Sequence, residues 1–400
     1  MANTEEPVDP RFADDAVDLS LLRRRAFNLR WATLPEDVIP LTAADPDFPV
    51  AEPIREAIIA YAQGGYFSYG PAEGLPEFRE AAARMLRERK GIAAEAEQVL
   101  AANSAAAAME TAARFMLAPG EQAIISDPVD FLFARSVEAA GGEAVRWPCD
   151  PATAAVDFDR LESLIGPRTR MIGLCNPLNP VGKVWTQAEL ERLGELALRH
   201  RLWILADEIW SDIVFAPARH VSIAAISPEL AARTVTVTGL SKSFGLAGLR
   251  VGLLHAGNAE VVEGLLEVSG ARSTANGVAT LSQVAAVAAW TSAWSWVDAF
   301  SRHLHAMRDL CVARLRAIPG VHCRPPDGCY VVFVDIRETG QNVEDLCKTL
   351  LEEHRVAVVP GLPRWFGPGA EGHLRICFAT SRALLVAGLD RLSAGLGAAP

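Results

Sequence analysis

Seven short apolar runs, separated by stretches of helical periodicity, constrain the fold of this chain more than any other feature. They occupy residues 99–102, 123–126, 144–147, 170–175, 202–206, 234–238 and 251–255. Strands that alternate with helices form a mostly parallel sheet, because each crossover returns the chain to the same edge. The pattern therefore predicts a doubly wound α/β fold that binds ligands at the carboxyl ends of its strands.

Lys242 follows the run 234–238, so the sheet places this side chain at its edge. Burial would disfavour the ammonium and lower its pKa, leaving an amine able to attack an aldehyde and hold it as a Schiff base. A lysine that extends from the sheet edge into water is the alternative. Two other lysines, Lys90 and Lys348, stand in charged helical stretches, and we expect both on solvated faces.

The segment SKSFGLAGLRVG, from Ser241 to Gly252, resembles the lysine motif of the class I/II aminotransferases. These are fold-type I enzymes that use pyridoxal 5'-phosphate (PLP), and the resemblance extends over residues 41–396. It implies that Lys242 binds PLP as a Schiff base, that Ser241 lies beside the cofactor and that Arg250 grips its phosphate. It also implies a large domain with a mostly parallel seven-stranded sheet and a small α+β domain.

Two other strand ends match cofactor contacts of this family. Ser104, Ala105 and Ala106 begin a helix directly after the first run, where free N–H groups and the helix dipole favour a phosphate. Asn179, in NPLNPVG, matches an asparagine that donates to the phenolic oxygen of the cofactor.

The segment ADEIW matches the family position at which an aspartate pairs with the pyridine nitrogen, and we assign Asp207 to this role. Glu208 is expected to face solvent. Trp210 stands where the family has a tyrosine, and an indole N–H is a bulkier donor in a different place. Asp130 replaces a second tyrosine, which stacks on the cofactor ring. Either Phe131 supplies the stacking face, or the ring has an acidic neighbour.

Arg375, Asn179 and Ala44 match the substrate side of the family pattern, and Tyr69 matches a contact to the cofactor phosphate. Arg375, in HLRICF, corresponds to the arginine that binds the substrate α-carboxylate through a bidentate pair. Ala44 lies in a segment that crosses the mouth of the active site. Tyr69, in YGPAEG, corresponds to a tyrosine that reaches the phosphate of the neighbouring subunit, which implies a homodimer with active sites at the interface.

We expect three segments along the chain. Residues 1–53 join the small domain, residues 54–295 form the large PLP-binding domain, and residues 296–400 form a bridging helix and the small domain. The amphipathic stretch 295–318 is the expected bridge.

Composition narrows the classes of partner. A net charge of -11 and the lack of a basic stripe argue against nucleic acid, and no apolar run is long enough to cross a bilayer. The first twenty residues lack the features of a secretory signal, so a cytoplasmic location is expected. The seven cysteines show no CxxC spacing and no histidine pair has metal-ligand spacing, so we expect neither disulfides nor a metal site.

These features predict a PLP-dependent enzyme that acts on an amino acid through an external aldimine and an α-carbanion, with aminotransferase chemistry as the first choice. The alternatives are a C–S β-lyase, and a biosynthetic enzyme of β/γ-replacement or ring formation. The ADPDF segment and the non-tyrosine Trp210 resemble the cystathionine β-lyase-like branch of the family. A non-catalytic PLP-binding protein is a further alternative, against which the retention of Lys242, Asp207, Asn179 and Arg375 counts.

Overall fold

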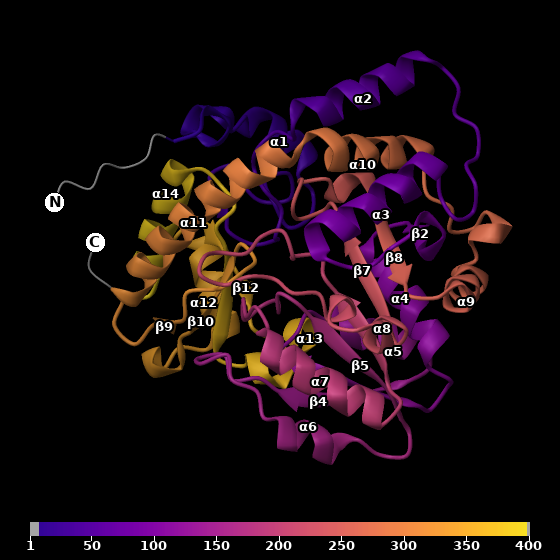
Figure 1. Ribbon diagram of the computed structural model, residues 1–400. Coiled ribbons are helices and arrows are strands. Elements are labelled where there is room, and N and C mark those ends of the chain that lie inside the picture. The colour runs from indigo at the N-terminus through magenta and orange to yellow at the C-terminus, as the bar shows by residue number, and fades with distance from the viewer. Residues whose placement is uncertain (1–7, 398–400) are drawn as a thin grey trace.

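The computed structural model describes residues 8–397, in which helices surround one large and two smaller sheets (Figure 1). The large sheet has the order β2-β8-β7-β6-β5-β3-β4. Its strands are β2 (Val99–Ala102), β3 (Gln122–Asp127), β4 (Glu143–Pro148), β5 (Thr169–Cys175), β6 (Trp203–Asp207), β7 (Thr234–Gly239) and β8 (Gly252–Ala256). Each predicted run is confirmed as a strand, with boundaries within one residue of those expected.

Strand direction confirms the mostly parallel sheet. β4, β3, β5, β6 and β7 run parallel, whereas β8 is antiparallel to both of its neighbours, β7 and β2. The chain reverses between β7 and β8 through a loop without a crossover helix, and this loop carries Lys242. β2 and β7 therefore point the same way, and their carboxyl ends share one edge with those of β5 and β6.

Helices cover both faces of the large sheet because successive strand residues point to opposite sides. Ile125 packs with α4, α5 and α9, while its neighbour Ile124 packs with α6, α7 and α8. These helices are α4 (Ala105–Met116), α5 (Leu132–Ala139), α6 (Phe158–Leu164), α7 (Gln187–Arg199), α8 (Pro228–Ala231) and α9 (Ala259–Ser269). The sheet is thus buried on both sides, as its near-continuous apolar strands predict.

The C-terminal part has an antiparallel sheet of order β12-β13-β10-β9. Its strands are β9 (His322–Cys323), β10 (Val331–Asp335), β12 (Val359–Pro360) and β13 (His373–Cys377). A parallel pair, β1 (Ile39–Pro40) with β11 (Val356–Ala357), ties the N-terminal segment to this part. Its helices are α12 (Val343–Glu352), α13 (Pro363–Phe366) and α14 (Arg382–Gly395).

Five further helices complete the fold of residues 8–397. They are α1 (Leu19–Arg25), α2 (Glu52–Gln63), α3 (Pro76–Lys90), α10 (Thr280–Ser292) and α11 (Trp294–Arg316). In Figure 1, α2 lies along α10, and α11 runs from α10 toward the C-terminal elements. The helix predicted over 295–318 is therefore confirmed as α11, while the three-segment division stays a prediction, and its residues 1–7 and 398–400 lie outside the described part. Within residues 8–397, no helix has both the length and the apolar character needed to cross a membrane.

Candidate active site

A cavity of about 440 Å³ lies at the carboxyl edge of the large sheet. Asp207 ends β6, while Asn179 and Lys242 stand in the loops that follow β5 and β7. Every predicted site residue except Tyr69 lines this cavity. They are Ala44, Ser104, Ala105, Ala106, Asp130, Phe131, Asn179, Asp207, Trp210, Ser241, Lys242, Arg250 and Arg375. The sheet topology thus brings together residues that are far apart in the sequence.

The Lys242 amine points into the cavity. Its Nζ donates to the Ala44 carbonyl at 2.7 Å and lies 5.2 Å from the centre of the Trp210 ring. Desolvation lowers the pKa of Lys242, the nearby Arg375 charge lowers it further, and Asp45 opposes both. The lowered pKa favours the neutral amine, which is the nucleophilic form that the sequence pattern predicts.

Asp207 is a buried acid, with 7 % of its surface exposed. One of its carboxylate oxygens accepts from the Ile209 N–H at 3.1 Å. Burial raises the pKa of Asp207 to about 7, and the neighbouring Asp130 raises it further, while the Ile209 N–H and Lys242 oppose the shift. No ion pair formed by residues 8–397 includes Asp207. A buried acid of this kind suits a protonated ring nitrogen, which would supply the missing positive charge.

The start of α4 forms an anion-binding cradle. Ser104 is its N-cap and accepts from the Ala107 N–H at 3.2 Å, while Arg250 donates to the Ser104 hydroxyl at 2.9 Å. The first N–H groups of a helix have no partner within the helix, so those of Ala105 and Ala106 are available to an anion. A Cβ on Gly252 would lie 2.8 Å from the Ala105 nitrogen, so β8 can pass this close only as glycine.

Asn179 connects an acid to an arginine. Its Nδ2 donates to Asp130 at 2.7 Å, and its Oδ1 accepts from Arg375 at 3.3 Å. Asp130 therefore faces the cavity, and Phe131 lines the same wall, with its ring 5.5 Å from that of Trp365 in an edge-on contact. Asp130 and Phe131 both line the cavity, so the choice between a stacking Phe131 and an acidic neighbour of the ring stays a prediction.

Arg375 is buried on β13, and its guanidinium lies 5.1 Å from the Phe366 ring centre. Desolvation lowers the pKa of Arg375, and the Asp130 charge opposes this shift. Its Nε has no hydrogen-bond partner among the described residues. A buried guanidinium with an unused donor has the chemistry needed to bind a carboxylate in the cavity.

Several lining residues were not predicted from the sequence. They are Asn28, Leu29, Ala43, Met109, Leu132, Cys175, Ile209, Ala247, Val359, Trp365 and Phe366. Tyr330 was also missed, although its hydroxyl donates to the Ala44 carbonyl at 3.1 Å and its ring packs edge-on against Trp210. The adjacent aromatic residues Trp365 and Phe366, in the short helix α13, are the one sequence signal for this wall, and they do not indicate which segment they pack against.

Tyr69 lies outside the cavity and is 92 % exposed in the single chain. It stands between α2 and α3 with two other exposed aromatic residues, Tyr66 and Phe67. The structure of one chain therefore does not bring Tyr69 to the other site residues. Its predicted role across a subunit boundary stays a prediction.

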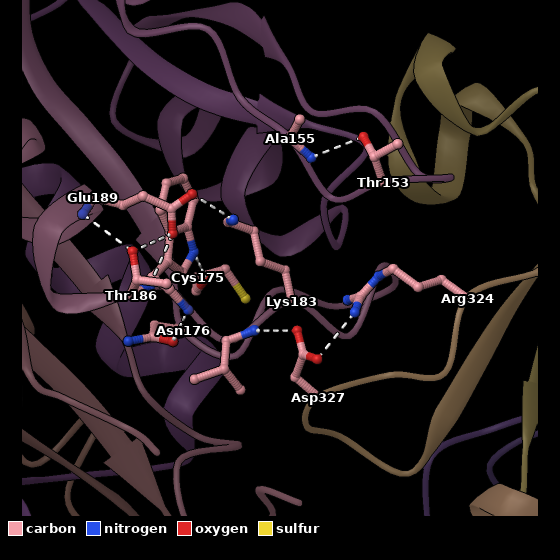
Figure 2. A network of polar contacts seen from close by, with 11 residues as sticks. Thr153, Ala155, Cys175, Asn176, Lys183, Thr186, Glu189, Arg324 and Asp327 are labelled. Atoms are coloured by element: carbon pink, nitrogen blue, oxygen red, sulfur yellow. Dashed lines mark hydrogen bonds and ion pairs between the residues drawn. The ribbon is translucent and has the colours of Figure 1, made fainter. Parts of the chain in front are cut away.

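Polar contacts stabilise the loop that carries Asn179, and Figure 2 shows this network. Lys183 is buried and donates to Glu189 at 2.7 Å, and the Trp185 N–H donates to Asn176 at 3.2 Å. Asp327 accepts from Arg324 at 3.0 Å and from the Val184 N–H at 3.4 Å. These contacts join the segment after β5 to the loop before β10, and they hold the backbone near Asn179 in place.

Two predictions about charged residues were wrong. Lys90 is buried and pairs with Asp212, which also accepts from the Ser243 hydroxyl at 2.7 Å. Lys90 ends α3, and its side chain turns inward beneath the loop of Lys242, so the charged helical pattern did not place it on a solvated face.

Glu208 is also buried, because the chain turns inward after β6. It accepts from the Ser222 hydroxyl at 2.6 Å, and burial raises its pKa to about 7.

The sequence led us to expect neither disulfides nor a metal site. Within residues 8–397, no group of three or more metal-ligating side chains is found, and the cysteines are all free.

The residues present fit PLP. The cradle at Ser104 suits a phosphate, Asp207 suits a protonated ring nitrogen, and Lys242 offers an amine to an aldehyde. These three features lie in one cavity, each at the end of a different strand or at the helix start that follows it.

Comparison with known proteins agrees with this fit. A model of the family described as aminotransferase class I and II matches residues 36–392. The aspartate aminotransferase of Geobacillus stearothermophilus is 32 % identical over 362 residues, which cover 89 % of this chain and 90 % of the relative. The arginine–pyruvate transaminase of Pseudomonas aeruginosa is 33 % identical over 342 residues, 85 % of each chain.

A solved structure of a PLP-bound putative aminotransferase from Clostridium difficile superimposes with a TM-score of 0.88. It is 26 % identical, and the match covers 96 % of this chain and 99 % of that one. The chain therefore belongs to the class I and II aminotransferase family. It is a PLP-dependent enzyme of the aminotransferase type with the fold-type I architecture.

Proposed function

We propose that this enzyme transfers an amino group between an amino acid and a keto acid, with Lys242 as the residue that binds PLP and moves protons at the substrate α-carbon. The observation that carries the proposal is the convergence of Lys242, Asp207, Asn179 and Arg375 on one cavity, beside the anion cradle of Ser104. When bound, PLP supplies an electron-withdrawing ring that stabilises negative charge at the α-carbon.

Each protein group then has one task. Arg375 binds and orients the α-carboxylate, and Asn179, which contacts Arg375, helps to fix that orientation. The Lys242 amine, whose pKa burial lowers, removes the α-proton and returns it to a different carbon. Asp207 would keep the ring nitrogen of the bound cofactor protonated, and Arg250 with the start of α4 would hold its phosphate.

The proposal includes a homodimer. Tyr69, Tyr66 and Phe67 form an exposed aromatic loop, and exposed aromatic groups are enriched where subunits meet. A partner subunit seated on this loop would receive Tyr69 at its own phosphate cradle. A cytoplasmic location also belongs to the proposal, and the free cysteines suit a reducing compartment.

C–S β-elimination is the second candidate, and Trp210 is the observation that favours it. Its indole packs against Tyr330 and beneath Lys242, at the position where a tyrosine is usual in aminotransferases. The ADPDF segment, which begins at Ala44, also favours the lyase. A β-lyase would use the same Lys242 base and the same Arg375 anchor, so these two residues do not separate the candidates.

Product analysis separates the two reactions. The PLP-loaded enzyme is incubated with a panel of amino acids, with and without a keto acid acceptor. Transamination gives a new keto acid and a new amino acid in equal amounts, and only when the acceptor is present. Release of pyruvate and ammonia from cysteine or cystathionine without an acceptor would contradict the proposal and support the lyase.

A further inference from the structure

Asp130 is the one acidic residue of the cavity wall to which the proposed function gives no task. Its Oδ2 accepts from Asn179 at 2.7 Å and its Oδ1 accepts from the Leu132 N–H at 3.1 Å. None of the ion pairs found within residues 8–397 includes Asp130. A carboxylate oxygen can accept more than one hydrogen bond, so Asp130 keeps acceptor capacity that faces the cavity.

A census of the other lining charges shows what Asp130 could bind. Under the proposed function, Lys242 and Asp207 serve the aldehyde and the ring nitrogen, Arg250 serves the phosphate and Arg375 serves the α-carboxylate. These are all of the other lining residues with a formal charge in the described part of the chain. Asp130 is the one lining charge that neither the cofactor nor the α-carboxylate and α-amino groups of the substrate would pair with.

This charge lies at the substrate end of the cavity. Asn179 joins Asp130 to Arg375 through contacts of 2.7 and 3.3 Å. The segment that precedes α5 also meets α13, where the Val129 N–H donates to the Phe366 carbonyl at 2.9 Å. Asp130 therefore shares a wall with the proposed carboxylate anchor, and its charge also acts on Asp207.

Aromatic faces complete the same wall. Phe131 and Trp365 lie edge-on at 5.5 Å, and the Phe366 ring lies 5.1 Å from the Arg375 guanidinium. An acid beside aromatic faces is a favourable environment for a cation, which gains both an ion pair and cation–π contacts. A second carboxylate on the substrate would find no free cation among the described lining residues and would be repelled by Asp130.

We propose that Asp130 selects amino acids whose side chain carries a positive charge, such as an amine or a guanidinium, and rejects those with a side-chain carboxylate. This inference rests on the proposed function, because it takes Arg375 as the site of the α-carboxylate. It goes beyond that function by naming the substrate class.

Asp130 also has a local structural role, which the test must separate from selectivity. Its Oδ1 accepts from the backbone N–H at the start of α5. Asparagine keeps an oxygen that can accept this bond, and it replaces the charge and the acceptor of the Asn179 amide by an uncharged amide group. Asp130→Asn is therefore the variant of choice.

The experiment compares substrates that differ only in side-chain charge. L-lysine is paired with L-norleucine and L-glutamate with L-glutamine, and the PLP-loaded wild-type and Asp130→Asn enzymes receive each of them. The Kd follows from spectral titration of the bound cofactor, and kcat/KM from turnover with a keto acid acceptor. Spectral titration reports binding even where turnover is slow.

We expect the wild type to prefer lysine over norleucine, and glutamine over glutamate. Loss of one charge-assisted contact should lower the kcat/KM for lysine by about ten- to a hundredfold in Asp130→Asn, with norleucine changed by less than about threefold. Equal use of lysine and norleucine by the wild type would overturn the inference. An equal loss for both substrates in the variant would also overturn it, because that result indicates a structural role.

The two proposals fail in different ways. Transamination without a charge preference leaves the proposed function intact and overturns the selection by Asp130. A charge preference in the Kd values without transamination of any amino acid supports the selection by Asp130 and overturns the proposed function. Absence of both binding and turnover would overturn both.

Discussion

The two ends of the cavity are built from different parts of the molecule. The cofactor end consists of strand ends and a helix start of the large sheet, with Asp207, Lys242 and Ser104 as its main residues. The substrate end consists largely of loops and short elements, where Asp130, Trp365 and Phe366 meet Arg375. Asp207, Lys242 and Ser104 match the family pattern, as does Arg375, while Asp130 and Trp210 depart from it. Chemistry common to the family is thus fixed by the sheet, and selectivity is carried by the loops.

Loss of Lys242 should have the largest effect, because the cofactor end depends on its amine. Lys242→Ala removes both the nucleophile that captures the cofactor and the proposed base, so we expect activity to fall by at least about 10⁴-fold. The visible absorption of the bound cofactor should also be lost. Lys348→Ala, at an exposed position, is the matched control and should keep both. Retained absorption in Lys242→Ala would refute the assignment.

Asp207 should make the cofactor-free protein sensitive to pH. Burial raises its pKa to about 7 from the ordinary value near 3.8, so the folded state binds this proton more tightly than the unfolded state. The free energy of unfolding should therefore fall as the pH rises from about 4 through about 7, by up to ~4 kcal/mol from this group.

Denaturant unfolding of the cofactor-free protein at pH 5 and pH 8 measures this dependence. Asp207→Asn is the comparison, since it keeps the shape of the side chain and removes its titration. The fall in stability between the two pH values should be smaller in the variant, with the remainder coming from groups such as Glu208. An identical fall in both proteins would show that Asp207 is not perturbed.

The buried pair of Lys90 and Asp212 supports the cofactor end from beneath. Lys90→Met leaves Asp212 buried without its cation, and we expect the free energy of unfolding to drop by about 3 kcal/mol. The double variant Lys90→Met with Asp212→Leu should recover part of this loss, because no unpaired charge remains. Equal stability of Lys90→Met and wild type in urea unfolding would show that the pair is not buried.

At the substrate end, Arg375→Lys tests the carboxylate anchor. Lysine keeps the charge but loses the planar pair of donors, so kcat/KM for amino acids should fall by about a hundredfold, or about 2.7 kcal/mol. The cofactor absorption should remain unchanged, because the variant leaves the cofactor end intact. An amine without a carboxylate is the control substrate and should react at the same rate with both enzymes. A fall in cofactor affinity in Arg375→Lys would show that Arg375 also supports cofactor binding, which contradicts the separation of the two ends.

Tyr69 should show the smallest effect, and it tests whether the cofactor end is completed by a partner. Tyr69→Phe removes one hydrogen bond to a charged group and should weaken PLP binding by about tenfold. Mixed dimers of Tyr69→Phe and Lys242→Ala subunits provide the sharper test. If Tyr69 acts across the interface, the tyrosine of the Lys242→Ala subunit completes the site of its partner and restores tight binding there. Tight binding would stay absent if Tyr69 acted within its own chain.

The large sheet was predicted from strand periodicity, and the resemblance to the family named most of the residues that line the cavity. Strand periodicity located β2 to β8, and parallel strands of one sheet must end at a common edge, which places Asp207 and Lys242 together. The helix start at Ser104 was recognisable because it directly follows the first apolar run, and the structure shows Ser104 as the N-cap of α4.

The missed features depend on contacts between distant segments. Trp365 and Phe366 join the cavity because α13 folds against the start of α5, and no local pattern encodes that contact. Lys90 was assigned to a solvated face because its neighbours are charged, while its partner Asp212 stands 122 residues away in the chain. Pairs of this kind are visible only after the chain has folded.

The most direct test of the central claim is to find which lysine carries the cofactor. The PLP-loaded protein is reduced with borohydride, digested and analysed by mass spectrometry. The account predicts a single stoichiometric pyridoxyl label on Lys242. A label on Lys90, Lys183 or Lys348 instead, or a protein that takes up no label, would contradict it.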